Sequence, residues 1–185
     1  LERARQAARH GADERERLFL AALEDWAAGR PEQALARHLA IARRWPRDLL
    51  NAKLAQVHQL NLGDRRGMAE LSAATLAAAP EISYAWGLHA FALEQVGEFA
   101  AAQRAGERAV EMNRDDPWAQ HAVAHVFEAR GEIDRGLGWL DELAPTWERC
   151  SSFMLTHNWW HVALFHLARG DGAQALALYD RRVWG

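Results

Sequence analysis

Glycine recurs at a fixed interval through most of the chain, each time at the end of an apolar helical stretch. The interval is 34 residues between the first four positions and 39 before the last, in the series Gly29, Gly63, Gly97, Gly131 and Gly170. Glycine stops helices because it adopts the left-handed backbone conformation without steric cost. A second apolar-periodic stretch follows each glycine, so every repeat is predicted to contain a helix, a tight turn and a second helix.

Two further features mark the second helix of the predicted pairs. Pro46 and Pro80 stand 17 residues after their glycines and close the helix, because proline cannot continue a helix interior. The position five residues after each glycine is Ala or Gly in four of the five repeats, which permits two helices to approach closely. These positions are Ala34, Met68, Ala102, Gly136 and Ala175.

The pattern predicts ten helices and almost no strand, since no stretch alternates apolar and polar residues. The expected first helices span residues 13–28, 48–62, 82–96, 115–130 and 154–169. The expected second helices span residues 31–44, 65–79, 99–112, 133–143 and 172–183. Short connections make paired helices antiparallel neighbours. A longer loop is expected before the fifth pair, around residues 145–152.

A helix–turn–helix unit repeated every 34 residues is the signature of the tetratricopeptide repeat. We therefore expect an all-α, tetratricopeptide-type solenoid of five helix pairs, wound as a right-handed superhelix. One unit cannot bury its apolar face alone, so successive units stack, and their first helices line a concave groove. Residues 1–185 are expected to form one domain, with units at about 13–46, 48–80, 82–114, 115–145 and 154–185.

Charge and composition narrow the classes of partner. The chain has 22 basic and 25 acidic residues and a net charge of −3, which argues against a general nucleic-acid binder. No apolar run approaches the roughly 18 residues of a membrane span, and no signal peptide is visible, so we expect a cytoplasmic protein without a membrane partner. The single cysteine, Cys150, fits a reducing compartment.

Several segments are more specific than the repeat itself. Two of them, in the second half, read DPWAQHAVAHVFE at 116–128 and HNWWHVALFH at 157–166; shorter ones lie at 46–50, 90–94 and 175–180. Together they resemble the tetratricopeptide repeat protein 38 family, in the same order and over nearly the whole chain. The resemblance implies a helical repeat fold and no defined activity. It matches the middle part of longer proteins. Either further chain or another subunit of a homo-oligomer is expected to cover the end at Trp184.

Polar residues gather at the positions that face the groove in this repeat class, about 13, 10, 6, 3 and 2 residues before the closing glycine. His121, His125 and Glu128 fall there, and their spacings of four and three stack them on one helix face. Neighbouring first helices add further side chains. The complete set of candidate ligand-binding residues is Lys53, Glu94, Trp118, His121, His125, Glu128, His157, Trp160 and His161.

Three interpretations of this group remain open. The first is a structural network in which His and Glu satisfy one another as buried polar groups. The second is a Zn²⁺ or non-haem iron site, because His pairs four residues apart on two helices, with a carboxylate, supply suitable ligands. Its ligands would be His121, His125, Glu128, His157 and His161.

The third interpretation is a metal-free pocket. A histidine beside a glutamate can act as a general base, because its pKa lies near neutral and the carboxylate orients it. Trp118 and Trp160 would supply stacking surface, and Lys53 a positive charge for an anionic ligand.

The favoured function is a binding or scaffold protein whose groove holds a peptide or a small-molecule ligand, since this fold is most often an interaction module. The alternative is a metal-dependent or His-based enzyme that uses the same residues, and the sequence leaves that choice open. Of the remaining histidines, His58, His89 and His166 are expected to pack between helices, and His10 and His38 to be exposed.

Overall fold

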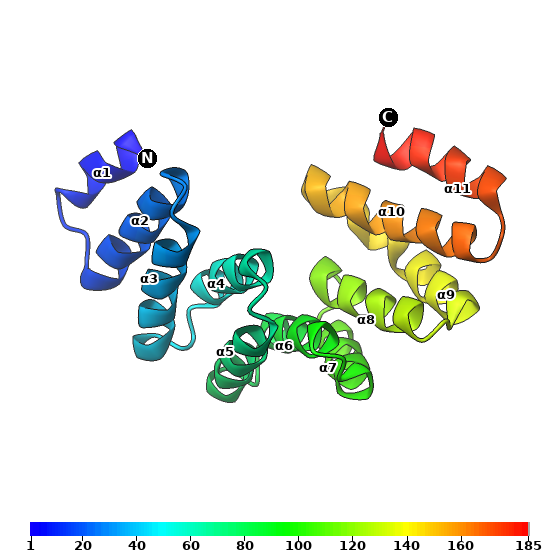
Figure 1. Cartoon of the computed structure of the whole chain (residues 1–185), viewed down its shortest axis with the longest axis horizontal. Coiled ribbons are helices and arrows are strands. Elements are labelled where there is room, and N and C mark those ends of the chain that lie inside the picture. Colours follow the sequence, from blue (N-terminus) through cyan, green and yellow to red (C-terminus); the bar gives the residue numbers. More distant parts are fainter. Residues whose placement is uncertain (185) are drawn as a thin grey trace. The chain divides into compact units, whose positions relative to one another are not determined.

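The computed structural model describes residues 1–184, and these residues are helical with no strand. Five adjacent helix pairs follow one another along the chain, each joined by a short turn (Figure 1). The first helices of the pairs are α2 (Glu14–Ala27), α4 (Leu49–Leu62), α6 (Ser83–Gln95), α8 (Pro117–Ala129) and α10 (Ser152–Ala168). The second helices are α3 (Pro31–Arg44), α5 (Arg65–Ala78), α7 (Phe99–Met112), α9 (Ile133–Leu143) and α11 (Gly172–Leu178). The predicted all-α arrangement of five pairs is confirmed.

The helices group into two compact units, Leu1–Glu81 with α1 to α5 and Ile82–Gly185 with α6 to α11. That the whole chain forms one domain stays a prediction. No helix within residues 1–184 combines the length and the apolar character that crossing a bilayer requires.

The repeated glycines end the first helices as expected. All five have positive φ angles, from 68° at Gly131 to 87° at Gly170, which is the left-handed region. The next helix often begins at an aspartate: Asp64 and Asp171 each accept a backbone N–H of the following turn.

Two elements were not expected from the sequence. Helix α1 (Glu2–Ala8) precedes the first pair, and a 3-10 helix, η1 (Ala144–Arg149), occupies the stretch predicted as a loop. Trp147 of η1 is completely buried, and its indole N–H donates to Oε1 of Gln120 on α8 at 2.6 Å. The connection before the fifth pair is therefore part of the packing that holds α8.

Helices α8, α9 and α10 share the main core of the second unit. Val123, Phe127, Leu140 and Phe165 are buried together there with Trp147. The small-residue positions allow this packing: a Cβ on Gly136 would lie 2.4 Å from the ring of Phe165, far inside van der Waals contact. Glycine at this position thus lets α9 lie directly against α10.

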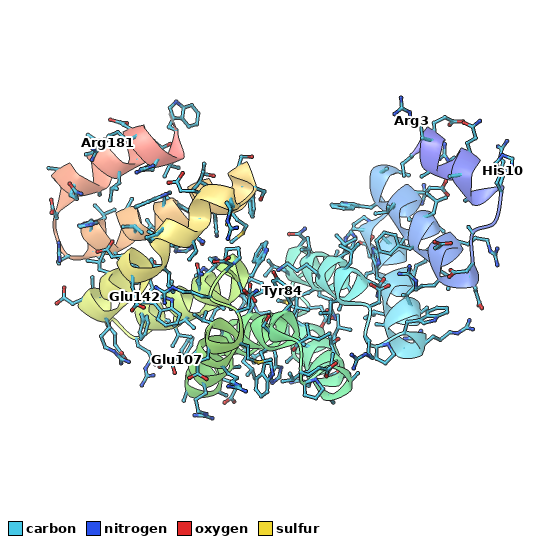
Figure 2. All side chains as sticks on the ribbon, turned by 180° about the vertical axis from the view of Figure 1, so that it is seen from behind. Arg3, His10, Tyr84, Glu107, Glu142 and Arg181 are labelled. Atoms are coloured by element: carbon cyan, nitrogen blue, oxygen red, sulfur yellow. The ribbon has the colours of Figure 1, made fainter. Side chains whose placement is uncertain are left out.

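The described part of the chain ends with a short π-helical turn, η2 (Tyr179–Val183), followed by Trp184. Trp184 is 79% exposed and stacks on Tyr179 with ring centroids 6.4 Å apart. Arg181 of η2 is also exposed (Figure 2). That another subunit covers this apolar surface stays a prediction.

In the first unit, one of the two histidines predicted to be exposed is buried. His10 is exposed, as predicted (Figure 2), but His38 is completely buried, so the prediction that it is exposed was wrong. The reason lies in α4, where Asn51 provides a buried partner: His38 Nδ1 lies 2.8 Å from Asn51 Oδ1, and the Asn51 amide donates to the His38 carbonyl at 2.9 Å. His58 is buried too, as expected.

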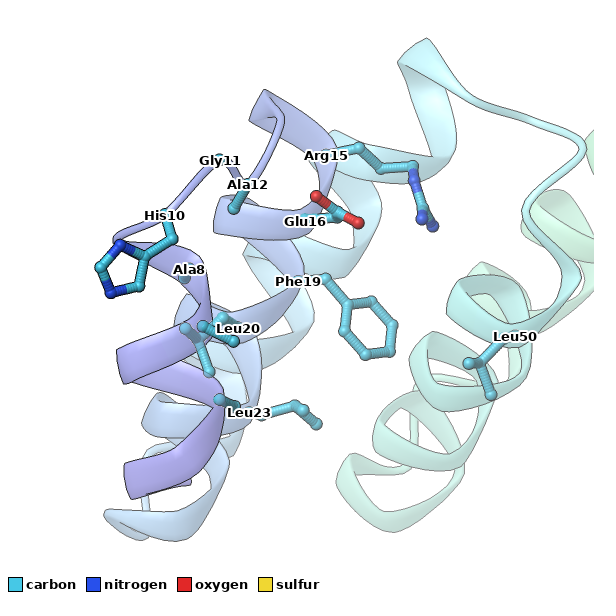
Figure 3. Close-up of a pocket in the computed structure, with 12 residues that line it drawn as sticks. Ala8, His10, Gly11, Ala12, Arg15, Glu16, Phe19, Leu20, Leu23 and Leu50 are labelled. Atoms are coloured by element: carbon cyan, nitrogen blue, oxygen red, sulfur yellow. The ribbon is translucent and has the colours of Figure 1, made fainter.

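A cavity of about 520 Å³ lies in the first unit between α1, α2 and Leu50 of α4 (Figure 3). Its walls are mostly Ala and Leu. The charged side chains at its edge bind elsewhere: Arg15 donates to Asp48 at 2.6 Å, and Glu16 accepts the Asp13 N–H at 2.9 Å. The cavity is therefore mainly apolar.

Candidate functional site

Four histidines meet where α8 and α10 lie side by side in the second unit. Each helix carries two of them four residues apart, which places each pair on one helix face: His121 and His125 on α8, His157 and His161 on α10. The two helices contact one another directly. His121 contacts His157, and His125 contacts His161. The two histidines of each of these cross-helix pairs are 36 residues apart in the chain.

The ring nitrogens of the four converge. Nε2 of His157 lies 2.9 Å from Nε2 of His121 and 3.3 Å from Nε2 of His161, and Nε2 of His161 lies 3.2 Å from Nε2 of His125. Each histidine offers one ligand atom, and all four of these atoms lie within 4.8 Å of one another. The structure thus forms a group that could hold a metal ion; we call it the four-His group.

Hydrogen bonding alone does not satisfy these contacts. A neutral imidazole nitrogen presents either one N–H or one lone pair in the ring plane. The Nε2 atoms of His157 and His161 each have two short contacts to other Nε2 atoms. Each nitrogen can complete only one ordinary hydrogen bond, so at most two of the three contacts can be satisfied. When both cross-helix contacts are hydrogen bonds, the contact between His157 and His161 is left without one.

Two carboxylates face the opposite nitrogens of the rings. Oε2 of Glu94, on α6, lies 3.3 Å from Nδ1 of His125, and Oε2 of Glu128, on α8, lies 3.6 Å from Nδ1 of His161. The Glu94 side chain is 13% exposed and also accepts the amide of Gln95. A carboxylate at Nδ1 favours the tautomer with its proton there, which leaves the lone pair on Nε2.

The protonation of His157 follows from its burial. The pKa of His157 is lowered to about 4 by burial, and further by the charges of His161 and His125. The pKa of Glu128 is lowered by its polar contact with His161 and by the charge of His125. At neutral pH, His157 is therefore neutral with its lone pair available, and Glu128 is an anion.

Aromatic rings surround the four-His group, as the sequence predicted for two of them. The Trp118 ring lies 5.8 Å from that of His121, and the Trp160 ring lies 5.6 Å from that of His157. Two further rings were missed. Phe91 of α6 lies 5.7 Å from His121, and Phe153 stacks on His157 at 5.4 Å with an interplanar angle of 11°. Phe153 precedes His157 by four residues, a spacing that could have identified it.

One predicted residue belongs to the other unit. Lys53 is on α4 in the first unit, whereas the four-His group lies entirely in the second. Its part in binding an anion stays a prediction. Within the second unit, His166 lies 3.9 Å from Asp171 and is not a member of the four-His group.

No model of a known protein family matches the chain. Solved structures do. A thermophilic tetratricopeptide repeat protein of Thermus thermophilus aligns with a TM-score of 0.72 and 18% identity, over 90% of this chain and 89% of its own. A tetratricopeptide repeat protein of Parabacteroides merdae also aligns with a TM-score of 0.72, with 16% identity over 97% of this chain and 70% of its own. YrrB, a tetratricopeptide repeat protein with an unusual peptide-binding site, aligns with a TM-score of 0.55 and 15% identity, over 96% of this chain and 89% of its own.

These likenesses show the fold: the chain is a tetratricopeptide-type helical repeat protein. At such low identity they show nothing finer. The resemblance to the tetratricopeptide repeat protein 38 family stays a prediction, as do the roles of the individual site residues.

Proposed function

We propose that this protein is a tetratricopeptide-type binding module in which the four-His group holds a divalent transition-metal ion, and that the ion forms part of the site that recognises a ligand. The proposal rests on the convergence of four Nε2 atoms, because hydrogen bonds cannot satisfy all of the contacts between these atoms. A cation at their centre would accept all four lone pairs at once.

The distances support this interpretation. Zinc binds imidazole nitrogen at about 2.0–2.1 Å, so the nitrogens of a tetrahedral site lie about 3.3–3.4 Å apart. The three Nε2 contacts of the four-His group measure 2.9, 3.2 and 3.3 Å. Shifts of a few tenths of an ångström would bring these three edges to the spacing that an ion requires, and the other three edges of the tetrahedron are at most 4.8 Å long.

The two carboxylates fit the outer shell of such a site. Histidine ligands usually donate their second ring N–H to a carboxylate, which fixes the tautomer and makes the ligand more basic. Glu94 and Glu128 stand at Nδ1 of His125 and His161. We therefore assign Glu128 to this outer role instead of the direct ligation that its spacing suggested.

The donor set narrows the choice of ion. Imidazole nitrogens suit Zn²⁺, Fe²⁺ and their neighbours in the first transition row, whereas Ca²⁺ and Mg²⁺ prefer oxygen ligands. Zn²⁺ and Fe²⁺ are the two ions we propose.

Metal content tests the proposal directly. Protein purified without chelator should contain close to one Zn or Fe per chain by plasma mass spectrometry. His125→Ala and His157→Ala should each lose most of that metal. His166→Ala is the matched control, because His166 lies on α10 outside the four-His group, and it should retain the metal.

Circular dichroism should show helical protein in all variants, so that loss of metal is not loss of fold. A wild-type protein that contains neither metal, and takes up neither from excess Zn²⁺ or anaerobic Fe²⁺, would rule the site out.

A further inference from the structure

Two members of the four-His group are partly exposed and two are buried. His121 and His161 are 2% and 4% exposed, whereas the side chain of His125 is 23% exposed and His157 is half-buried. A ligand that reaches the ion must therefore approach past His125 and His157.

Aromatic rings border that approach. Phe153 and Trp160 flank His157 on α10, and they are 59% and 41% exposed. Trp118 lies 6.1 Å from Phe153 with their planes 32° apart. We call Trp118, Phe153 and Trp160 the aromatic border. Large exposed rings gathered beside a polar group are typical of a surface that contacts a ligand, and ring faces favour flat partners.

The charge balance points to an anion. Four neutral imidazoles leave the double positive charge of an ion uncompensated in its first shell. Two acidic side chains in contact with the four-His group, Glu94 and Glu128, stand at the outer, Nδ1 ends of the His125 and His161 rings. An anionic group from a ligand that binds the ion as a fifth donor would offset this charge.

From these observations we infer that the site binds an aromatic carboxylate, with the carboxylate on the ion and the ring against Phe153 and Trp160. This inference rests on the proposed metal site and names the ligand class of that same site. The carboxylate is either that of a small aromatic acid or the C-terminus of a peptide that ends in an aromatic residue.

Cobalt-substituted protein provides the test, since Co²⁺ takes the place of Zn²⁺ and its visible bands report changes in its ligands. Benzoate should shift these bands and half-saturate at a concentration about tenfold or more below that of acetate, because its ring gains contact with the aromatic border. Phe153→Ala and Trp160→Ala should keep full cobalt content while the advantage of benzoate over acetate falls to about threefold or less.

Tyr179→Ala is the matched control, because Tyr179 is an exposed ring of η2 that stacks on Trp184 instead; it should leave the benzoate advantage unchanged. Cobalt that binds while benzoate and acetate act alike, or while neither moves the bands, would overturn the inference and leave the metal site standing. Protein that binds no cobalt would overturn the proposed function as well.

A second comparison distinguishes a peptide C-terminus from a small acid as the source of the carboxylate. Tighter binding of N-acetylglycylphenylalanine than of 3-phenylpropionate would identify a peptide C-terminus, and the reverse order a small acid.

Discussion

The two units bury their histidines in different ways. In the first unit, His38 and His58 stack with ring centroids 5.5 Å apart and planes only 25° apart. In the second, the four-His group turns its Nε2 atoms toward one another. Stacked rings direct their in-plane nitrogens side by side, whereas converging rings direct them at a common point. Burial of histidine is thus shared by the two units, but the convergence of Nε2 atoms is found in the second.

Partner residues explain the difference. His38 lies on a second helix and finds an amide partner, Asn51, on the next first helix. Phe19 and Trp26 of α2 pack against the stacked pair with ring centroids 5.6 and 5.0 Å from His38 and His58. This is how a repeat accommodates histidine as a core residue. The four-His group lies only on first helices, where neighbouring repeats face each other.

The largest effect expected from the difference between the two histidine groups is a gain in folding stability when a metal ion binds to the four-His group. Free Zn²⁺ at a thousand times its dissociation constant should stabilise the folded chain by about 4 kcal/mol. For a chain of this size, that raises the melting temperature by roughly 8–16 °C. Differential scanning calorimetry with Zn²⁺ and with EDTA measures it. The double variant His121→Ala, His125→Ala should lose the shift; an undiminished shift would place the ion elsewhere.

The corresponding experiment in the first unit replaces a buried histidine that is not expected to bind metal. His38→Ala should lower the free energy of unfolding by about 2–4 kcal/mol, because it leaves a cavity and removes the partner of buried Asn51. Metal content should remain that of the wild type. Chemical denaturation and plasma mass spectrometry on the same preparation check both points. Loss of metal in this variant would remove the distinction drawn between the two histidine groups.

A smaller effect is expected from the outer carboxylate. Glu94→Gln keeps the shape of the side chain but removes the charge facing Nδ1 of His125. Loss of such a partner typically weakens metal affinity about 10- to 100-fold. Competition with a chelator of known affinity measures this change. Glu98→Gln, an exposed position just beyond α6, is the control and should change nothing. Equal affinities for both variants would mean that Glu94 does not support a ligand.

Much of the second unit's site could be predicted because it depends on spacing. The closing glycines set the register, and pairs of histidines four residues apart must share a helix face. Phe153 was missed because the predicted helix began at residue 154, whereas α10 begins at Ser152. The two added residues bring Phe153 into the helix, four residues before His157 and therefore on the same face.

Other features depend on contacts that are distant in sequence. His38 stands beside Arg37 on an amphipathic helix, and nothing local shows that Asn51, thirteen residues away, will bury it. Similarly, the segment of η1 was predicted as a loop from the extra residues before the fifth pair, because nothing local indicates the hydrogen bond from Trp147 to Gln120, 27 residues away, that orders it. Such pairings follow from tertiary packing and carry no periodic signal.

The smallest expected effect is the pH dependence of the first unit. Burial lowers the pKa of His38, against a smaller opposing effect of its hydrogen bond to Asn51, and burial also lowers the pKa of His58. The folded chain therefore holds these rings neutral, while the unfolded chain binds protons near pH 6.5. Their contribution to stability is fully present above that pH and is lost as the pH falls below it.

The slope cannot exceed about 1.4 kcal/mol per pH unit for each histidine, since each binds one proton. Unfolding free energies of metal-free protein between pH 7 and 5.5 should therefore fall less steeply in His38→Gln than in the wild type. His10→Gln is the control, because His10 is exposed and should leave the slope unchanged. If His38→Gln and the wild type fall in parallel, His38 is protonated in the folded state. The first unit would then hold a charged histidine, and the contrast between a neutral stacked pair and a converging group would fail.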